Sequence, residues 1–196
     1  MRRAVVGLMA LVALLLAGCG APAPDVPAPD GTEAVAPSPF QPCPATAPAS
    51  SAPPPAGAAL VPDVALPCFV GGQAVSLRAL GQPAVINLWS SSCAPCRDEM
   101  PELQRFADET AGRILVLGVI TADTRNAAAF AGADFAVHYP SLWDPDRQLL
   151  KALGRNAIPV TLFVDAQGVV RHLDMSGALT QAEFARLAIE HLGLST

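Results

Sequence analysis

Beyond about residue 60, the chain alternates short apolar runs with polar, glycine-containing turns. Apolar runs of four to eight residues between turn signals are typical of strands buried in a sheet. One pair of runs flanks Gly71-Gly72 and another flanks the turn at 166–168, so each pair predicts a hairpin. The predicted strands are 64–69, 74–77, 84–89, 114–120, 160–165 and 169–173.

Segments with helical periodicity lie between and after these runs. The first has apolar residues at three- and four-residue intervals, which places them on one helix face. These residues are Met100, Leu103, Phe106 and Ala107. Thr180 and Glu183 form a capping-box pattern, which starts the last helix. The predicted helices are 94–110, 124–130, 146–153 and one that begins at Thr180. Alternating strands and helices predict an α/β fold, and the closing hairpin makes its sheet mixed.

The N-terminus carries a different apolar pattern. Arg2 and Arg3 precede an apolar run at 4–16, which is too short to span a bilayer of about 30 Å. This pattern predicts a signal peptide over residues 1–18. The run ends in Leu-Ala-Gly-Cys, which resembles the bacterial lipobox and makes Cys19 the expected lipidation site. An ordinary signal peptide is the alternative, and the arginine pair matches the twin-arginine export signal poorly.

A proline-rich stretch separates this leader from the apolar runs. The chain has 20 prolines, and 12 of them lie between residues 20 and 59. Large apolar side chains are scarce there, so the stretch cannot bury enough surface to offset the entropy of ordering it. We therefore expect three parts: a signal peptide at 1–18, a lipidated cysteine with a disordered linker at 19–59, and a folded domain at 60–196.

Charge narrows the range of partners. The net charge is −5, and no lysine or arginine occurs between Arg3 and Arg78. Binding to a phosphate backbone needs a basic patch, so nucleic acid is excluded as an expected partner.

Cys43 and Cys68 are two cysteines without a local motif. Outside the cytoplasm two such cysteines usually pair, which predicts a structural disulfide. Zinc is the alternative, but structural zinc sites use four ligands that commonly come in close pairs, and neither cysteine has such a neighbour.

Cys93-Ala94-Pro95-Cys96 is the segment with the clearest chemistry, because it follows a predicted strand and opens a predicted helix. Free backbone N–H groups at a helix N-terminus stabilise a thiolate, which is the form of cysteine that attacks a disulfide. We expect Cys93 to be the attacking thiol and Cys96 the resolving thiol, with no cofactor.

Other uses of this motif fit less well. Haem attachment needs a histidine after the second cysteine, and Arg97 stands there. A peroxidatic cysteine of the peroxiredoxin type would have a proline seven positions earlier, where this chain has Ile86. A purely structural disulfide stays open as the simplest alternative.

The segment from Asn87 to Pro101, NLWSSSCAPCRDEMP, resembles the active-site stretch of TlpA-like thiol–disulfide oxidoreductases of the ResA and CcmG branch. The segment from Ile158 to Asp165, followed by Gly168, resembles their cis-proline segment. The resemblance covers about residues 60 to 194. It implies a thioredoxin-like mixed β-sheet flanked by helices, with an N-terminal β-hairpin extension.

The resemblance also implies roles for single residues. Pro159 matches the cis-proline beside the CxxC, with Ile158 facing the attacking sulfur; a trans proline that opens a strand is the alternative. Glu99 matches an active-site acid that exchanges protons with the thiols; a solvated partner of the helix dipole is the alternative. Trp89 matches the tryptophan that packs below the site.

Two positions depart from related patterns. Asn87 stands where classical thioredoxins carry a buried aspartate, so proton handling must come from another group. Ser92 replaces the aromatic residue that usually precedes the first cysteine, which puts the choice of substrate in doubt.

The expected function is a membrane-anchored, extracytoplasmic disulfide reductase. The resembled family acts on protein disulfides, for example in apocytochrome c, and a membrane thiol carrier of the CcdA or DsbD type would supply electrons. A disulfide-forming oxidase uses the same residues and is the alternative. A lipoprotein that binds a partner without redox chemistry is the alternative from a different class.

Overall fold

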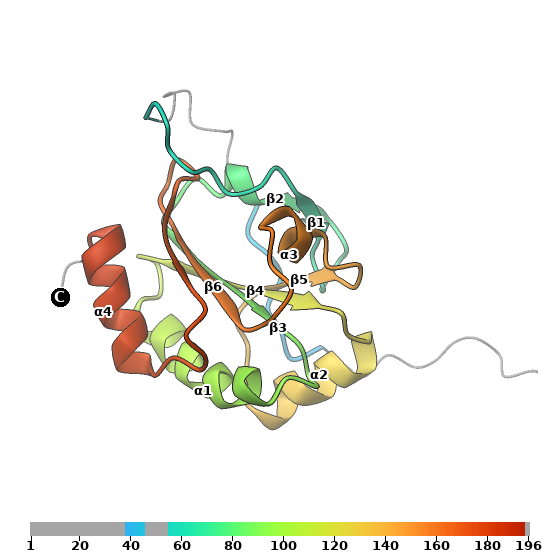
Figure 1. The fold of residues 1–196 in the computed structure, drawn as a ribbon. Coiled ribbons are helices and arrows are strands. Elements are labelled where there is room, and N and C mark those ends of the chain that lie inside the picture. Colours follow the sequence, from blue (N-terminus) through green and yellow to red (C-terminus); the bar gives the residue numbers. More distant parts are fainter. Residues whose placement is uncertain (1–37, 46–54, 195–196) are drawn as a thin grey trace, which may run out of the picture. The chain divides into compact units, whose positions relative to one another are not determined.

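The computed structural model describes residues 38–45 and 55–194 (Figure 1). The predicted signal peptide at 1–18 and the predicted lipidation site Cys19 lie outside the described residues, as does much of the predicted linker. No helix of the described ranges is long and apolar enough to cross a membrane.

A five-stranded mixed sheet forms the centre of the fold. Its spatial order is β5-β4-β3-β6-β7, and β3, β4 and β5 run parallel. Strand β6 pairs antiparallel with β3, and β7 pairs antiparallel with β6. The bounds are β3 (Ala84–Trp89), β4 (Leu115–Thr121), β5 (Ser141–Asp144), β6 (Val160–Val164) and β7 (Val170–Asp174). The predicted mixed α/β fold is confirmed.

Four α-helices accompany the sheet, and their bounds are α1 (Ala94–Glu109), α2 (Arg125–Asp134), α3 (Gln148–Ala152) and α4 (Gln181–Leu192). Thr180 caps α4 with the predicted capping box, in which its hydroxyl and the Glu183 carboxylate satisfy opposite backbone amides. Helix α2 extends beyond its predicted end at residue 130, because the small residues Ala131 and Gly132 of its last turn are also buried against the domain.

Side chains alternate between the two faces of the sheet, so each central strand contributes to two apolar clusters. In β3, Val85 and Trp89 face the cluster formed with α1, α2 and α4. Ile86 and Leu88 face the second cluster, which is closed by α3 and the N-terminal hairpin. Figure 1 shows α1 and α4 together, with α3 elsewhere on the sheet. The result is a three-layer arrangement in which β3 is buried along its whole length.

The N-terminal extension is the predicted hairpin, formed by β1 (Ala65–Pro67) and β2 (Ala74–Ser76), and a short 3₁₀ helix, η1 (Leu77–Ala79), follows it. Just beyond β1, Phe69 donates its amide to the Ser141 carbonyl at 2.8 Å, so the chain here lies along the edge strand β5. Strand β5 is missing from the predicted elements.

Residues 38–45 differ from the disorder expected for the linker. Phe40 is 4% exposed and contacts the rings of Phe69 and Trp89 edge-on, with centroids 5.2 and 6.0 Å away. Gly132 of α2 makes room for this ring, because a Cβ there would lie 2.6 Å from it. The Phe40 side chain therefore helps to anchor this proline-rich segment to the domain.

Candidate active site

Cys93 caps the N-terminus of α1, and its backbone is extended. The Cys96 amide donates to Cys93 Sγ at 3.2 Å, and Pro95 occupies the first turn, where its missing N–H costs nothing. Cys93 and Cys96 form a disulfide in this structure. The helix N-terminus therefore directs a hydrogen-bond donor at the sulfur that would carry negative charge after reduction.

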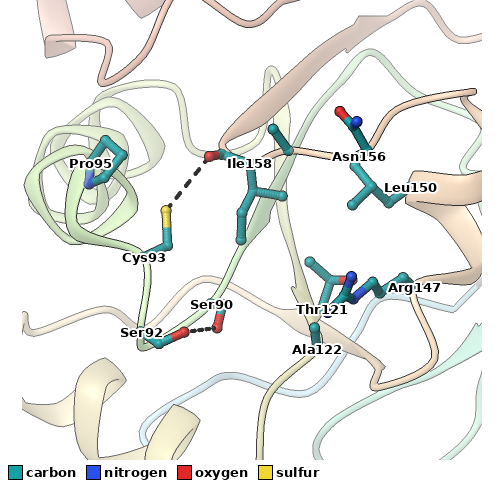
Figure 2. Close-up of a pocket in the computed structure, with 11 residues that line it drawn as sticks. Ser90, Ser92, Cys93, Pro95, Thr121, Ala122, Arg147, Leu150, Asn156 and Ile158 are labelled. Carbon is teal, nitrogen blue, oxygen red and sulfur yellow. Dashed lines mark hydrogen bonds between the residues drawn. The ribbon is translucent and has the colours of Figure 1, made fainter.

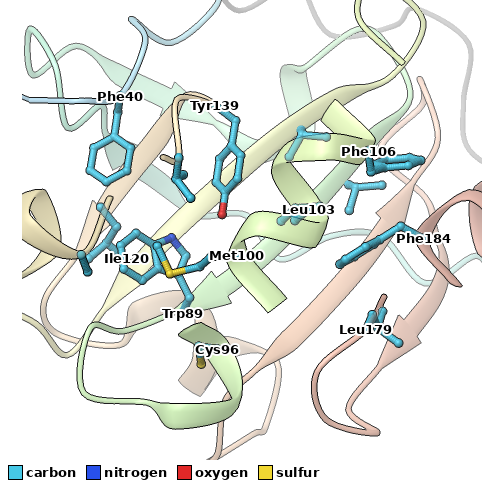
Figure 3. Close-up of a cluster of buried hydrophobic side chains, with 14 of the residues drawn as sticks. Phe40, Trp89, Cys96, Met100, Leu103, Phe106, Ile120, Tyr139, Leu179 and Phe184 are labelled. Atoms are coloured by element: carbon cyan, nitrogen blue, oxygen red, sulfur yellow. The ribbon is translucent and has the colours of Figure 1, made fainter. Parts of the chain in front are cut away.

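The two sulfurs differ in access. Cys93 is half-buried, whereas Cys96 is 1% exposed and belongs to the cluster that contains Trp89 and Met100 (Figure 3). A substrate disulfide can thus reach Cys93 from solvent. Cys96 is shielded from solvent and can react with Cys93 from inside the fold.

The segment before β6 lies against the outer sulfur. The Ile158–Pro159 bond is cis, and the Ile158 carbonyl oxygen lies 3.8 Å from Cys93 Sγ (Figure 2). A pocket of about 420 Å³ opens beside this contact. Its lining residues are Ser90, Ser92, Cys93, Pro95, Thr121, Ala122, Arg147, Leu150, Asn156, Ala157 and Ile158.

The loop before Cys93 is held by Asp123, a residue that the sequence analysis missed. The Asp123 carboxylate accepts from the Ser91 amide at 2.6 Å and from the Ser91 hydroxyl at 2.9 Å. The Arg97 guanidinium donates to the Ser91 carbonyl at 2.7 Å. Ser91 is therefore fixed through three of its polar groups, so the serine loop positions Cys93 without the aromatic residue usual at position 92.

Glu99 lies inside the fold, one helical turn after Cys96, and not on the solvated side of α1. It is 0% exposed, and its carboxylate accepts from Asn87 Nδ2 at 2.8 Å and from the Leu179 amide at 3.3 Å. Asn87 also donates to Thr161 Oγ1 at 3.0 Å. The alternative of a solvated dipole partner is wrong for Glu99, because Asn87 and Leu179 replace water as its donors.

Burial raises the pKa of Glu99 to about 7, since an ionised carboxylate loses its hydration inside the protein. The hydrogen bonds from Asn87 and Leu179 oppose this rise, and the negative charge of Asp174 adds to it. Glu99 is therefore a buried carboxyl that gains and loses its proton near neutral pH, which is the range suited to proton transfer.

This pKa predicts a pH-dependent stability. The folded chain holds a proton on Glu99 that the unfolded chain has released, so stability must fall as pH rises from about 4.5 to about 7. The Glu99 contribution is roughly 3 kcal/mol of unfolding free energy across this window. Urea unfolding from pH 4 to 8 is expected to show this fall in the wild type relative to Glu99→Gln.

Glu102→Gln is the matched control on the same helix. The pKa of Glu102 is lowered by the backbone hydrogen bond from Gln181 and by Arg105, so its titration lies below the Glu99 window. A constant difference between wild type and Glu99→Gln over this pH range would contradict the raised pKa.

The two remaining described cysteines also form a disulfide, Cys43–Cys68, with 25 residues of separation. Both are buried, and the Cys43 amide donates to Cys68 Sγ at 3.1 Å. The bond lies in the second apolar cluster, away from the α1 cluster that contains Cys96, and it joins the 38–45 segment to the chain after β1.

Comparison with known proteins gives the family. The model of the AhpC/TSA family matches residues 58–173. The chain belongs to this family. Among similar proteins, a DsbE thiol:disulfide interchange protein of Allochromatium vinosum is 38% identical over 94 residues, which is 47% of this chain and 51% of that protein. ResA, a thiol–disulfide oxidoreductase of Bacillus subtilis, is 24% identical over 56% of this chain and 63% of its own length.

A solved structure supports the fold. A secreted thiol–disulfide isomerase from Corynebacterium glutamicum is 26% identical and has a TM-score of 0.59, covering 68% of this chain and 86% of that one. The chain spans about half the length of the DsbE relative. This family member therefore has the thioredoxin-like fold, and the resemblance to the ResA and CcmG branch is confirmed. The relatives' names support an oxidoreductase.

Proposed function

We propose that the protein is an extracytoplasmic thiol–disulfide oxidoreductase that reduces disulfides in polypeptides. The observation that carries this proposal is the asymmetry of the CxxC: Cys93 is reachable and receives an amide hydrogen bond, while Cys96 is buried behind it. That arrangement suits attack by one thiol and resolution by the other. The names of the DsbE and ResA relatives support the same chemistry.

The reaction begins from the dithiol. The Cys93 thiolate attacks one sulfur of a substrate disulfide, forms a mixed disulfide with it and releases the other substrate sulfur as a thiolate. The Cys96 thiolate then attacks Cys93 Sγ, which forms the Cys93–Cys96 disulfide and releases the second substrate sulfur. Two electrons pass to the substrate, and its two thiolates each take up a proton.

Glu99 and Asn87 serve the second step. Cys96 must lose its proton before it attacks, and it is shielded from water. Glu99 follows one turn later on α1, and its pKa of about 7 lets the carboxylate accept that proton at neutral pH. Asn87, on β3, donates a hydrogen bond to this carboxylate and holds it in place. The buried acid thus comes from α1, whereas classical thioredoxins carry it on the strand.

Regeneration needs a dithiol donor. A membrane thiol carrier of the CcdA or DsbD type would return two electrons to the Cys93–Cys96 disulfide. Disulfides such as those of apocytochrome c, reduced before haem attachment, are the proposed substrates by analogy with the ResA and CcmG branch. A disulfide-forming oxidase is the second candidate, because the same cysteines run the exchange in either direction.

The reduction potential of the Cys93–Cys96 pair distinguishes the two directions. Equilibration of the purified chain with a dithiothreitol series is expected to give a value near −270 mV, about that of thioredoxin. The buried Cys43–Cys68 pair is followed separately by mass spectrometry of alkylated peptides. A value near −120 mV, about that of DsbA, would favour the oxidase and overturn the reductase proposal.

We also propose that lipid on Cys19 anchors the protein to the outer side of the cytoplasmic membrane, on the strength of the lipobox sequence. Cys19→Ala is expected to move the protein from washed membranes to the soluble fraction, because lipid chains supply the durable attachment. Ser38→Ala is a control outside the lipobox. Tight membrane association of the Cys19 variant would contradict the anchor.

A further inference from the structure

The basic side chains of this protein divide into two groups. Most of those described pair within the fold: four form salt bridges and three donate to backbone carbonyls. These residues are Arg78, Arg105, Arg171 and Arg186, then Arg97, Arg113 and Arg125. Within residues 38–45 and 55–194, the basic side chains without such a partner are Arg147, Lys151 and Arg155.

These three residues share one segment, 147–155, which we call the basic segment. All three are exposed; Arg147 is the N-cap residue of α3, with a left-handed backbone, and Lys151 lies in the last turn of α3. The segment itself includes no acidic residue, although the exposed Asp146 directly precedes it and the chain as a whole carries −5. The nearby Asp144 carboxylate is committed to the amides of Gln148 and Leu149, at 2.7 and 3.0 Å. An unpaired cationic surface on an acidic protein is suited to an acidic partner.

The basic segment borders the pocket beside Cys93. Arg147 and Leu150 line this pocket (Figure 2). The Arg155 amide donates to the Leu150 carbonyl at 3.0 Å. Asn156 continues the same wall toward Ile158, whose carbonyl lies next to Cys93 Sγ. Positive charge is thus placed where a polypeptide would lie during disulfide exchange.

Two further features of the pocket indicate a built binding site. Thr121 is 1% exposed, lines the pocket, and its Oγ1 has no hydrogen-bond partner among the described residues. Ala122 and Arg147 have φ of 53° and 58°, and they are two of the three described non-glycine residues with positive φ. Strained backbone tends to gather at functional sites, and here both examples line one pocket.

We propose that the basic segment docks an acidic stretch of the polypeptide whose disulfide Cys93 attacks, with Arg147 and Thr121 receiving a carboxylate next to the reacting sulfur. This inference rests on the proposed disulfide exchange and states which polypeptides the site would prefer as substrates. Ser92 fits the same picture, because a polar residue replaces the aromatic surface at this rim and leaves charge to select the substrate.

The test uses three synthetic peptides that each contain one intramolecular disulfide and differ only in the flanking residues, which are aspartate, asparagine or lysine. The measurement is the second-order rate constant at which each peptide oxidises the reduced full-length chain. At low ionic strength the aspartate peptide is expected to react about tenfold faster than the asparagine peptide. The ratio should fall toward one at about 1 M salt.

Variants assign this preference to the basic segment. Arg147→Asn combined with Lys151→Gln and Arg155→Gln should bring the aspartate-to-asparagine ratio near one; asparagine is chosen because it tolerates positive φ. Reversal with Arg147→Asp, Lys151→Glu and Arg155→Glu should make the lysine peptide the fastest, a gain that misfolding cannot produce. Arg186→Gln, on the surface of α4, is the matched control and should keep the wild-type ratio.

Two results would overturn the docking inference, and a third would overturn the proposed function. Equal rates for all three peptides in the wild type would overturn the docking inference and leave the exchange reaction standing. An aspartate preference that survives charge reversal would also overturn it. Failure of every peptide to oxidise the reduced chain would instead overturn the proposed function.

Discussion

Replacing Cys93 with serine is expected to abolish disulfide exchange, with the rate falling by at least about 10³-fold; loss of a catalytic nucleophile in other enzymes costs up to about 10⁶. A serine hydroxyl is not ionised at neutral pH, so the amide of Cys96 has no thiolate to stabilise. The measurement is reduction of a fluorescent peptide disulfide by the reduced protein.

Cys96→Ser is the matched variant that distinguishes the attacking role of Cys93 from the resolving role of Cys96. This variant keeps the attacking thiol, so a mixed disulfide between Cys93 and the peptide should accumulate and be detected by mass spectrometry. Cys93→Ser should form no such adduct. Exchange that persists in Cys93→Ser would reject the enzyme and favour a lipoprotein that binds a partner without redox chemistry.

Removal of the second disulfide is expected to have the largest effect on stability. Cys43→Ala with Cys68→Ala opens a loop with a sequence separation of 25. Loop entropy then predicts a loss of about 3.5 kcal/mol of unfolding free energy, because the unfolded chain regains conformations that the cross-link excludes. Urea unfolding of the oxidised proteins measures the difference.

The control keeps Cys43 and Cys68 and replaces the redox pair instead. In a Cys93→Ala, Cys96→Ala background, one described disulfide is left, and adding dithiothreitol should destabilise that protein by the same amount. A loss below about 1 kcal/mol, or alkylation of Cys43 in the native oxidised protein, would contradict a structural bridge.

Long apolar runs made the central sheet predictable from the sequence. The predicted strand at 84–89 is identical to β3, since every residue of that run is buried and no other element competes for it. Strand β5 escaped prediction for the opposite reason. It has four residues, and its ends, Ser141 and Asp144, are polar and buried through pairing with β4 and hydrogen bonds that no local pattern reveals.

The residues of the candidate site likewise divide into those with a local sequence signal and those defined by tertiary contacts. The CxxC could be predicted because its spacing and its place between a strand and a helix carry the chemistry, and Pro159 because the segment around it resembles the family's cis-proline segment. Asp123 was not, because an aspartate after a strand looks like an ordinary turn residue until its carboxylate is seen on Ser91. Arg147 was hidden too, since its importance lies in lacking a partner, which is a property of the folded chain.

Under the proposed lipid anchor on Cys19, the packing of Phe40 would limit how far the redox site can lie from the membrane. With lipid on Cys19, twenty residues would separate the anchor from Phe40, the first buried side chain among the described residues, where the sequence pattern suggests forty. At about 3.5 Å per residue, the maximum reach is about 70 Å in place of about 140 Å. Halving the radius shrinks the accessible volume about eightfold, so the proposed membrane-embedded electron donor would meet this site at about eightfold higher effective concentration.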